Sequence, residues 1–356
     1  MSKQRVDRLR KLLEQHDLEA LFVTNAVNRR YLSGFTGSSG YLVVTPQDAI
    51  LFTDFRYREQ APQQAKDFRV IEHQADPAET IAATLKELGV TRLGFEQHDL
   101  SYASYQSYQS KLGVTLVAAD KLIEQLRMVK DEQEVQLIET ACELVDRTCE
   151  HMLGFIKPGM TERDVALELE FYMRANGADS TSFSTIVVSG VRSSLPHGGP
   201  TDKVLEKGDF VTLDFGAYMN GYCSDITRTV VLGEPTDRHR EIYDIVLEAQ
   251  LTALERIRPG MTGKEADAIA RDLIARYGYG EHFGHGLGHG LGMEIHEEPR
   301  LSRTGEYVLE PGMIVTVEPG IYIPGFGGVR IEDDVVVTET GVRRLTKSSK
   351  QLEVLN

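Results

Sequence analysis

The chain has 356 residues and a formal net charge of −15 at pH 7, and 41% of its residues are hydrophobic. This length predicts two domains or one large domain with ample core, and the negative charge argues against a nucleic-acid-binding surface and against attachment to anionic membranes. The three cysteines lack metal-type spacing and indicate a reducing compartment rather than a disulfide framework. Because the chain starts with a charged amphipathic pattern and no apolar run approaches the ~20 residues of a membrane span, we expect a cytoplasmic protein.

The first 125 residues alternate between helical and strand patterns, which predicts an N-terminal α/β domain over residues 1–125. The glycine-rich loop at 34–40 lacks the lysine of a phosphate-binding loop, so we interpret it as a turn. The stretch 54–57 is interpreted as a strand end with a local ion pair. The expected elements are an opening helix, strands at 20–24, 41–44 and 50–53, a helix at 76–88, a strand at 92–95, a helix at 101–112 and a strand at 114–117.

A charged joint near residue 126 separates this part from a C-terminal domain over residues 126–356. Its first helix carries apolar residues at spacings of three or four, among them Cys142 and Cys149, which we interpret as core residues rather than reactive thiols. Further elements are expected as helices at 162–176, 239–256 and 264–276 and a strand at 186–189.

The stretch 208–231 reads as two strands around Asn220-Gly221, a dipeptide typical of a tight hairpin because both turn residues must tolerate positive φ. With a two-residue loop, Asp214 faces Thr227, and Asp225 lies two residues further along the same face, roughly 7–8 Å from Asp214 at the backbone. Two such carboxylates repel one another unless a cation lies between them, and a pair of divalent ions about 3.5–4 Å apart would fit. An acidic solvent-facing hairpin is the alternative.

The hairpin recurs later in the chain. The run 312–320 aligns with 208–216 and places Glu318 at the position of Asp214, and a following strand pattern places Glu332 at that of Asp225. A second match, between the helix openings at 156–161 and 257–262, has an offset of 101 residues, against 104 for the match of 208–216 with 312–320. These two matches predict an internal duplication with two similar halves that face each other and bring four carboxylates together.

Histidines provide the second strong signal. The stretch 281–299 holds His285, His289 and His296 among glycines that let the backbone approach a packed site. It is not a two-histidine zinc-protease helix, because His289 and His296 are seven residues apart and glycines make a helix between His285 and His289 unfavourable. His197 stands in a loop between proline and glycine; a lone loop histidine is usually a surface residue, but this one precedes the acidic hairpin.

Two aspartates, two glutamates and at least one histidine form a ligand set that suits Mn²⁺, Fe²⁺ or Co²⁺ better than a sulfur-rich structural zinc site, although Zn²⁺ stays an alternative. A bridged pair of such ions lowers the pKa of a shared water and polarises a carbonyl, which is the chemistry of metal-assisted amide hydrolysis.

In this order and with these flanks, the residues resemble the five ligands of the "pita-bread" metallopeptidases. With the N-terminal α/β domain the chain resembles their proline-specific branch, the Xaa-Pro dipeptidases (prolidases) and Xaa-Pro aminopeptidases, whereas methionine aminopeptidases share the ligands but lack such a domain. The resemblance covers nearly the whole chain and implies a C-terminal α+β pita-bread domain with a pseudo-twofold duplication. It rests on Asp214, Asp225, His289, Glu318 and Glu332 and on the stretches 195–198, 289–292 and 328–333.

The resemblance also implies roles for these residues. Asp214 would bind one ion, His289 and Glu318 the other, and Asp225 and Glu332 would bridge both, with Mn²⁺ the expected metal. A hydroxide bridging the ions would attack the carbonyl of the Xaa-Pro bond, and Glu318 would pass the proton to the proline nitrogen. The same resemblance gives His197 and His296 substrate orientation and oxyanion stabilisation. For Arg330 it leaves open a substrate carboxylate or a structural ion pair, and it makes His285 a neighbour that supports His289.

The expected substrate is therefore a peptide with proline at its second position, and a homodimer is implied because the N-terminal domain closes a neighbouring subunit's site in the family. The chain length favours a dipeptidase, but the loop at 34–40 and the stretch 54–57 also resemble aminopeptidases that act on longer peptides. A creatinase-like hydrolase without metal ligands and a non-catalytic binding module are more remote, because all five ligand positions are present.

Overall fold

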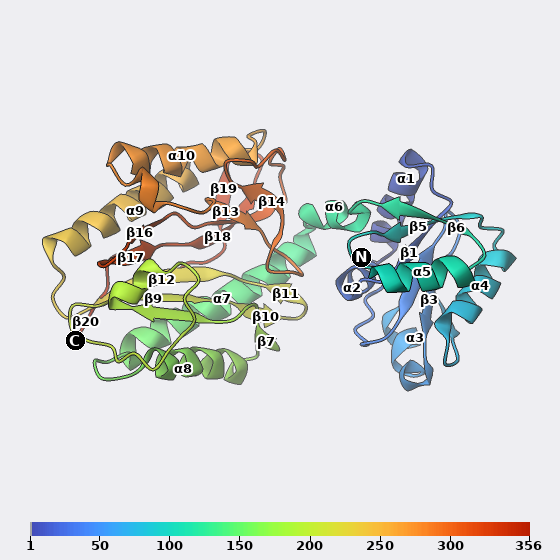
Figure 1. Ribbon diagram of the computed structural model, residues 1–356, viewed down its shortest axis with the longest axis horizontal. Helices are drawn as coiled ribbons and strands as arrows, with labels where there is room; N and C mark the ends of the chain where they lie inside the picture. The colour runs from blue at the N-terminus through green and yellow to red at the C-terminus, as the bar shows by residue number, and fades with distance from the viewer. Residues whose placement is uncertain (1) are drawn as a thin grey trace. The chain divides into compact units, whose positions relative to one another are not determined.

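The structure is a computed structural model in which residues 2–356 are described, and it divides between Arg127 and Met128 into two compact units (Figure 1). Within residues 2–356, no helix combines the length and the apolar character that a bilayer span requires.

The N-terminal unit is built on a six-stranded sheet in the order β4-β3-β2-β1-β5-β6. Strand β2 pairs antiparallel with β1 and with β3, and the other pairs are parallel. The apolar sheet residues pack with α4 into one core cluster. The elements are α1 (Ser2–Gln15), β1 (Ala20–Val23), α2 (Ala26–Ser33), β2 (Tyr41–Val44), β3 (Ala49–Thr53), η1 (Phe55–Tyr57), α3 (Gln60–Gln64), β4 (Arg69–Glu72), α4 (Pro77–Glu87), β5 (Arg92–Glu96), α5 (Tyr102–Lys111), β6 (Thr115–Ala119) and α6 (Leu122–Met128).

The predicted strands and helices of this unit are confirmed, whereas α2, α3, α6, β4 and the short 3-10 turn η1 were not predicted. Helix α2 carries both end signals that sequence reasoning uses: Asn25 caps its first turn and Gly34 follows its end in the left-handed conformation. The local ion pair expected at 54–57 is present, with Arg56 Nε 2.7 Å from Asp54 Oδ1.

In the C-terminal unit two helix pairs lie on either side of the strands, α7 with α8 on one side and α9 with α10 on the other (Figure 1). The main sheets have the orders β20-β12-β9-β8 and β14-β13-β15-β18-β19. The elements are α7 (Glu132–Phe155), α8 (Glu162–Ala175), β7 (Ser180–Thr181), β8 (Ile186–Ser189), η2 (Gly190–Ser194), β9 (Phe210–Phe215), β10 (Ala217–Met219), β11 (Tyr222–Cys223), β12 (Ile226–Leu232), α9 (Asp237–Arg256), α10 (Gly263–Arg276), η3 (Gly280–His282), β13 (Gly288–Gly290), β14 (Glu297–Leu301), β15 (Ile314–Val317), β16 (Gly320–Ile323), β17 (Gly327–Arg330), β18 (Asp333–Val337), β19 (Val342–Arg344) and β20 (Val354–Leu355).

The duplication is visible in matching details of the two halves. The second helix of each pair begins with the same capping box, formed by Thr161 at α8 and by Thr262 at α10. Each of these threonines also forms an isolated β-bridge, Thr161 with Val204 and Thr262 with Val308. Each half has its own apolar core, one between α7, α8, β9 and β12 and the other between α9, α10 and β15 to β18. The α+β fold with two similar halves is therefore as predicted.

The acidic hairpin has the predicted register. Asn220 and Gly221 form its turn with φ of 54° and 91°, and Met219 pairs with Tyr222 and Asp214 with Thr227. The ladder is interrupted beside Gly216, where an added Cβ would lie 2.0 Å from the Ser224 carbonyl oxygen. The hairpin bends at this point, so that β10–β11 and β9–β12 belong to different sheets and Asp225 lies at the bend.

Candidate metal centre

The first half contributes two carboxylates from neighbouring backbone positions. Asp214 lies on β9, and Asp225 lies just before β12, where its backbone N–H donates to Asp334 Oδ2 at 2.8 Å. Asp225 Oδ1 is buried and has no hydrogen-bond partner among the described residues. A buried carboxylate oxygen without a donor is costly unless a cation binds it, and this oxygen is therefore suited to hold one.

The second half contributes the equivalent pair. Strand β15 pairs with β18 with Val317 opposite Asp333, so that Glu318 and Glu332 stand at the next positions of the same register. Glu332 accepts a hydrogen bond from Thr227 Oγ1 at 2.5 Å, which links the two halves directly. Glu318 accepts one from Thr316 Oγ1 at 3.1 Å.

His289 points its Nε2 atom into this carboxylate cluster from β13. Nε2 lies 3.6 Å from Asp225 Oδ2 and 3.5 Å from Glu318 Oε1. The other ring nitrogen, Nδ1, lies 3.1 Å from the Gly290 carbonyl oxygen and donates to it in the neutral tautomer. Burial lowers the pKa of His289 to about 3, so the neutral ring presents a lone pair at Nε2, which is the form that binds a metal.

The electrostatics of the cluster favour bound cations. Burial raises the pKa of Asp225 and of Glu332 well above the ordinary values, and repulsion from neighbouring carboxylates raises both further. Burial also raises the pKa of Glu318 to about 7. Asp225, His289 and Glu332 each present one ligand atom within 4.8 Å of the others. Carboxylate oxygens with one imidazole fit divalent ions such as Mn²⁺, Fe²⁺ or Co²⁺, and such ions would offset the repulsion.

A cavity of about 440 Å³ opens onto the cluster. His197 and His296, both exposed, line it, and the His296 ring stacks edge-on against His289 with centroids 4.4 Å apart. Phe183, Ile186 and Ile295 add apolar wall. The cavity therefore combines an apolar surface with convergent polar groups, as small-molecule sites do.

Arg330 and His285 also line the cavity, and both contact the hydroxyl of Tyr322. The Arg330 guanidinium forms an ion pair with Asp214 and donates to Thr227 Oγ1 at 3.0 Å and to Tyr322 Oη at 2.6 Å. His285 Nε2 lies 2.8 Å from the same Tyr322 oxygen. This geometry favours the structural ion pair for Arg330, and His285 supports Tyr322 rather than contacting His289.

Arg300 is a cavity residue that the sequence reasoning did not identify. It lies on β14 directly opposite His289 on β13, and it lines the cavity with an exposed side chain. Its guanidinium makes no hydrogen bond or ion pair to any residue of the described range 2–356. No local pattern marks Arg300, because its place in the site depends on the pairing of β13 with β14.

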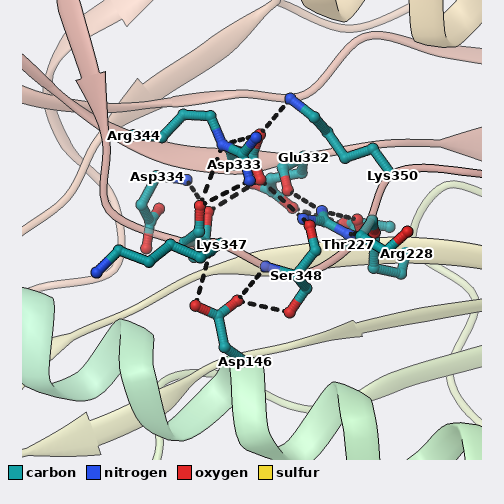
Figure 2. A network of polar contacts seen from close by, with 12 residues as sticks. Asp146, Thr227, Arg228, Glu332, Asp333, Asp334, Arg344, Lys347, Ser348 and Lys350 are labelled. Carbon is teal, nitrogen blue, oxygen red and sulfur yellow. Dashed lines mark hydrogen bonds and ion pairs between the residues drawn. The ribbon is translucent and has the colours of Figure 1, made fainter.

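A buried polar network holds the carboxylates from behind, and Figure 2 shows its members. Arg228 uses all five N–H donors: it donates to the carbonyl oxygens of Thr227, Glu332, Ser348 and Ser349 and to Asp333 Oδ1. Although burial opposes ionisation, Arg228, Lys350 and Arg344 outweigh it and hold the pKa of Asp333 below its ordinary value. The network therefore fixes the backbone beside Thr227 and Glu332.

The fold and this cluster define a metal-dependent hydrolase with a separate N-terminal unit. The family model described as "Metallopeptidase family M24" matches residues 136–339, and the one described as "Creatinase/Prolidase N-terminal domain" matches residues 5–129. The chain belongs to the metallopeptidase family M24, with the pita-bread fold of that family.

Similar proteins cover the whole chain. The Xaa-Pro dipeptidase of Pyrococcus furiosus is 43% identical over 352 residues, which are 98% of this chain and 99% of that protein. The solved structure of an Xaa-Pro dipeptidase from Bacillus anthracis has a TM-score of 0.98 at 49% identity and covers all of both chains. That of an X-Pro aminopeptidase from Thermotoga maritima has a TM-score of 0.93 at 40% identity, over 99% of this chain and 100% of that one.

Proposed function

We propose that this metallopeptidase hydrolyses the Xaa-Pro bond of dipeptides. The observation that carries the proposal is the convergence of three buried carboxylates, the half-buried Glu318 and the neutral His289 on one cavity, in a chain similar over its full length to Xaa-Pro dipeptidases. The proposed ligands are Asp214, Asp225, His289, Glu318 and Glu332, which would hold two divalent ions, with Asp225 and Glu332 in the proposed role of shared ligands, and Mn²⁺ is the proposed metal. When bound, the ions would activate a water molecule and polarise the scissile carbonyl.

The protein groups supply positioning and proton transfer. Glu318 lies at the rim of the cluster and is half-buried, so it reaches both the cavity and His289. We assign to it the proton that must reach the proline nitrogen, which is a poor leaving group until protonated. His197 and His296 line the mouth, where their N–H groups would donate to the carbonyl oxygen as negative charge develops on it.

Arg300 supports a dipeptide over a longer peptide. In an Xaa-Pro dipeptide the proline carries the free carboxylate, and Arg300 is a cavity cation with all its donors available to that carboxylate. Arg330 is less suited to this role because its donors are engaged with Asp214, Thr227 and Tyr322. Phe183, Ile186 and Ile295 offer apolar contact to the proline ring.

The test compares Ala-Pro with Ala-Pro-Ala on Mn²⁺-loaded protein, with a chelator control. Chelator-sensitive cleavage of the dipeptide alone supports the proposal. Release of alanine from the tripeptide supports the aminopeptidase alternative, to which the similarity with the Thermotoga maritima structure points. If protein that holds metal cleaves neither peptide, the result would favour a non-catalytic binding module over both peptidase functions.

Asp225→Asn tests the metal site itself. It should abolish turnover and lower the metal content, because Asp225 offers the buried oxygen without a partner. Asp272→Asn, at an exposed position of α10, is the matched control and should change neither quantity. Full metal-dependent activity of the Asp225 variant would refute its bridging role.

We also propose a homodimer and a cytoplasmic location. Light scattering of the purified chain tests the first: a monomer at all concentrations would exclude it. Cell fractionation tests the second.

A further inference from the structure

A second cavity, of about 380 Å³, lies in the C-terminal unit away from the carboxylates, between α7, the β9–β12 pair and the segment 347–353. Side chains alternate between the two faces of a strand. Asp214 and Thr227 therefore face the metal centre, whereas Leu213 and Arg228, one position along, line this second cavity. Its volume falls within the ~300–1,000 Å³ of ligand pockets.

The inner wall of this cavity is mostly apolar, and the one acidic residue that lines it there, Asp146, accepts hydrogen bonds from Ser348 Oγ and from the backbone N–H groups of Lys347 and Ser348. The apolar part of the wall consists of Cys149, Leu153, Leu213, Val230 and the ring of Tyr243. The Tyr243 hydroxyl donates to the backbone carbonyl oxygens of Lys350 and Gln351. Arg228 has all five donors engaged, and Thr229 Oγ1 donates to the Arg330 carbonyl oxygen. The deep part of the cavity is thus suited to a hydrocarbon or aromatic group and not to a charge.

The rim, in contrast, carries both signs of charge. Arg147 and Glu150 are exposed on α7, and Lys347 and Glu353 stand at the two ends of the segment 347–353 that closes the cavity. Lys347 Nζ also lies 3.6 Å from Glu139 Oε1, in an exposed ion pair. Arg147 makes no ion pair or hydrogen bond within residues 2–356. A ligand with an apolar body, a carboxylate and an ammonium group matches this arrangement in polarity and in charge.

We propose that this cavity binds a free apolar α-amino acid, with its side chain against Leu153, Leu213 and Val230 and its zwitterionic end among Arg147, Glu150, Lys347 and Glu353. The site shares Arg228 with the metal centre, because Arg228 forms part of its wall and donates to the carbonyl oxygens of Thr227 and Glu332. The inference goes beyond the proposed peptidase function and does not depend on it, since it concerns binding and not turnover.

The test is isothermal titration calorimetry of L-phenylalanine into the Mn²⁺-loaded full chain. We expect one site with a dissociation constant below about 1 mM. Leu153→Trp places a larger side chain in the cavity from a half-buried helix position and should weaken binding at least tenfold. Leu167→Trp is the matched control, because Leu167 is 60% exposed on α8 and does not line the cavity.

Two further measurements decide the location and the class of ligand. L-Phenylalanine that binds Leu153→Trp as tightly as wild type occupies another place, such as the peptidase site, and the proposal is then wrong. Arg147→Gln, at an exposed position with no hydrogen bond or ion pair within residues 2–356, should weaken binding about threefold to tenfold. If 2-phenylethanol, which lacks both charges, binds wild type as tightly as L-phenylalanine, or if neither binds at about 10 mM, the proposal is overturned.

Discussion

Arg300→Met offers the sharpest test of how the site selects a dipeptide. The substitution keeps much of the side-chain length and removes the charge and the donors. If Arg300 binds the proline carboxylate, kcat/KM for Ala-Pro should fall while that for Ala-Pro-amide, which lacks the carboxylate, should change little. Ala-Pro-Ala should not become a worse substrate either.

The magnitude follows from the exposure of Arg300. A hydrogen bond with a charged partner contributes about 1.5–3 kcal/mol, and the lower part of that range applies because the guanidinium is exposed at the cavity mouth. About 1.5–2 kcal/mol corresponds to a loss of roughly 10- to 30-fold. Arg300→Lys should restore part of it, because the charge returns without the paired donors.

The kcat/KM values for Ala-Pro and Ala-Pro-amide must be compared because the charge of Arg300 also affects other ionisable groups of the site. Its positive charge adds to the burial that lowers the pKa of His289 and of His296, and it opposes part of the rise that burial causes in the pKa of Glu318. An electrostatic effect of this kind would slow Ala-Pro and Ala-Pro-amide alike, whereas carboxylate binding affects Ala-Pro alone. Equal losses on both substrates would refute the carboxylate role. Arg303→Met, an exposed position nearby that does not line the cavity, should leave both rates unchanged.

Further predictions concern other parts of the chain. His296→Ala should reduce turnover far more than metal occupancy, and metal loss on elemental analysis would instead make His296 a ligand. Asp333→Ala should lower the free energy of unfolding by about 3–5 kcal/mol in urea denaturation, because Arg228 and Lys350 are left buried without their carboxylate; an effect under about 1 kcal/mol would contradict this. Gly216→Ala should destabilise the chain and weaken Mn²⁺ binding in calorimetry, since its Cβ meets the Ser224 carbonyl oxygen and shifts the bend before Asp225; wild-type affinity would speak against that coupling. Burial raises the pKa of Glu96 from 4.5 to about 7, so the folded state holds a proton that the unfolded state releases in this interval. Stability should therefore fall between about pH 5 and about pH 7, by up to about 3 kcal/mol, and Glu96→Gln should flatten this slope in urea denaturation; an unchanged slope would exclude Glu96 as its source.

The part of the site that the sequence predicts depends on local signals. Asn220-Gly221 sets the turn, and the turn sets the register that pairs Asp214 with Thr227. The second half could be predicted because it repeats the first, down to the matching bridges at Thr161 and Thr262. These features could be predicted because the residues that determine them lie close together in the sequence.

The features that the sequence could not predict depend on contacts between distant segments. Arg300 enters the cavity through its pairing with His289, and Arg228 reaches Ser348 and Ser349 far along the chain. The alternatives for Arg330 could be weighed only once Asp214 was seen beside it. Hydrophobic periodicity and turn residues give no information about contacts between segments that are distant in the sequence.

The proposed metal site lies at the interface between the two halves of the C-terminal unit, so metal binding would depend on the assembly of both halves. Of the proposed ligands, Asp214 and Asp225 belong to one half and His289, Glu318 and Glu332 to the other, so neither half alone would hold the complete proposed set. Across this interface, Thr227 Oγ1 donates a hydrogen bond to Glu332, and the Arg228 guanidinium donates one to Asp333 Oδ1. If the C-terminal unit were cut between its halves, the two fragments would associate more tightly with divalent ions than without them, because the ions bind the assembled pair. The ions would then stabilise the association of the two halves in addition to taking part in catalysis.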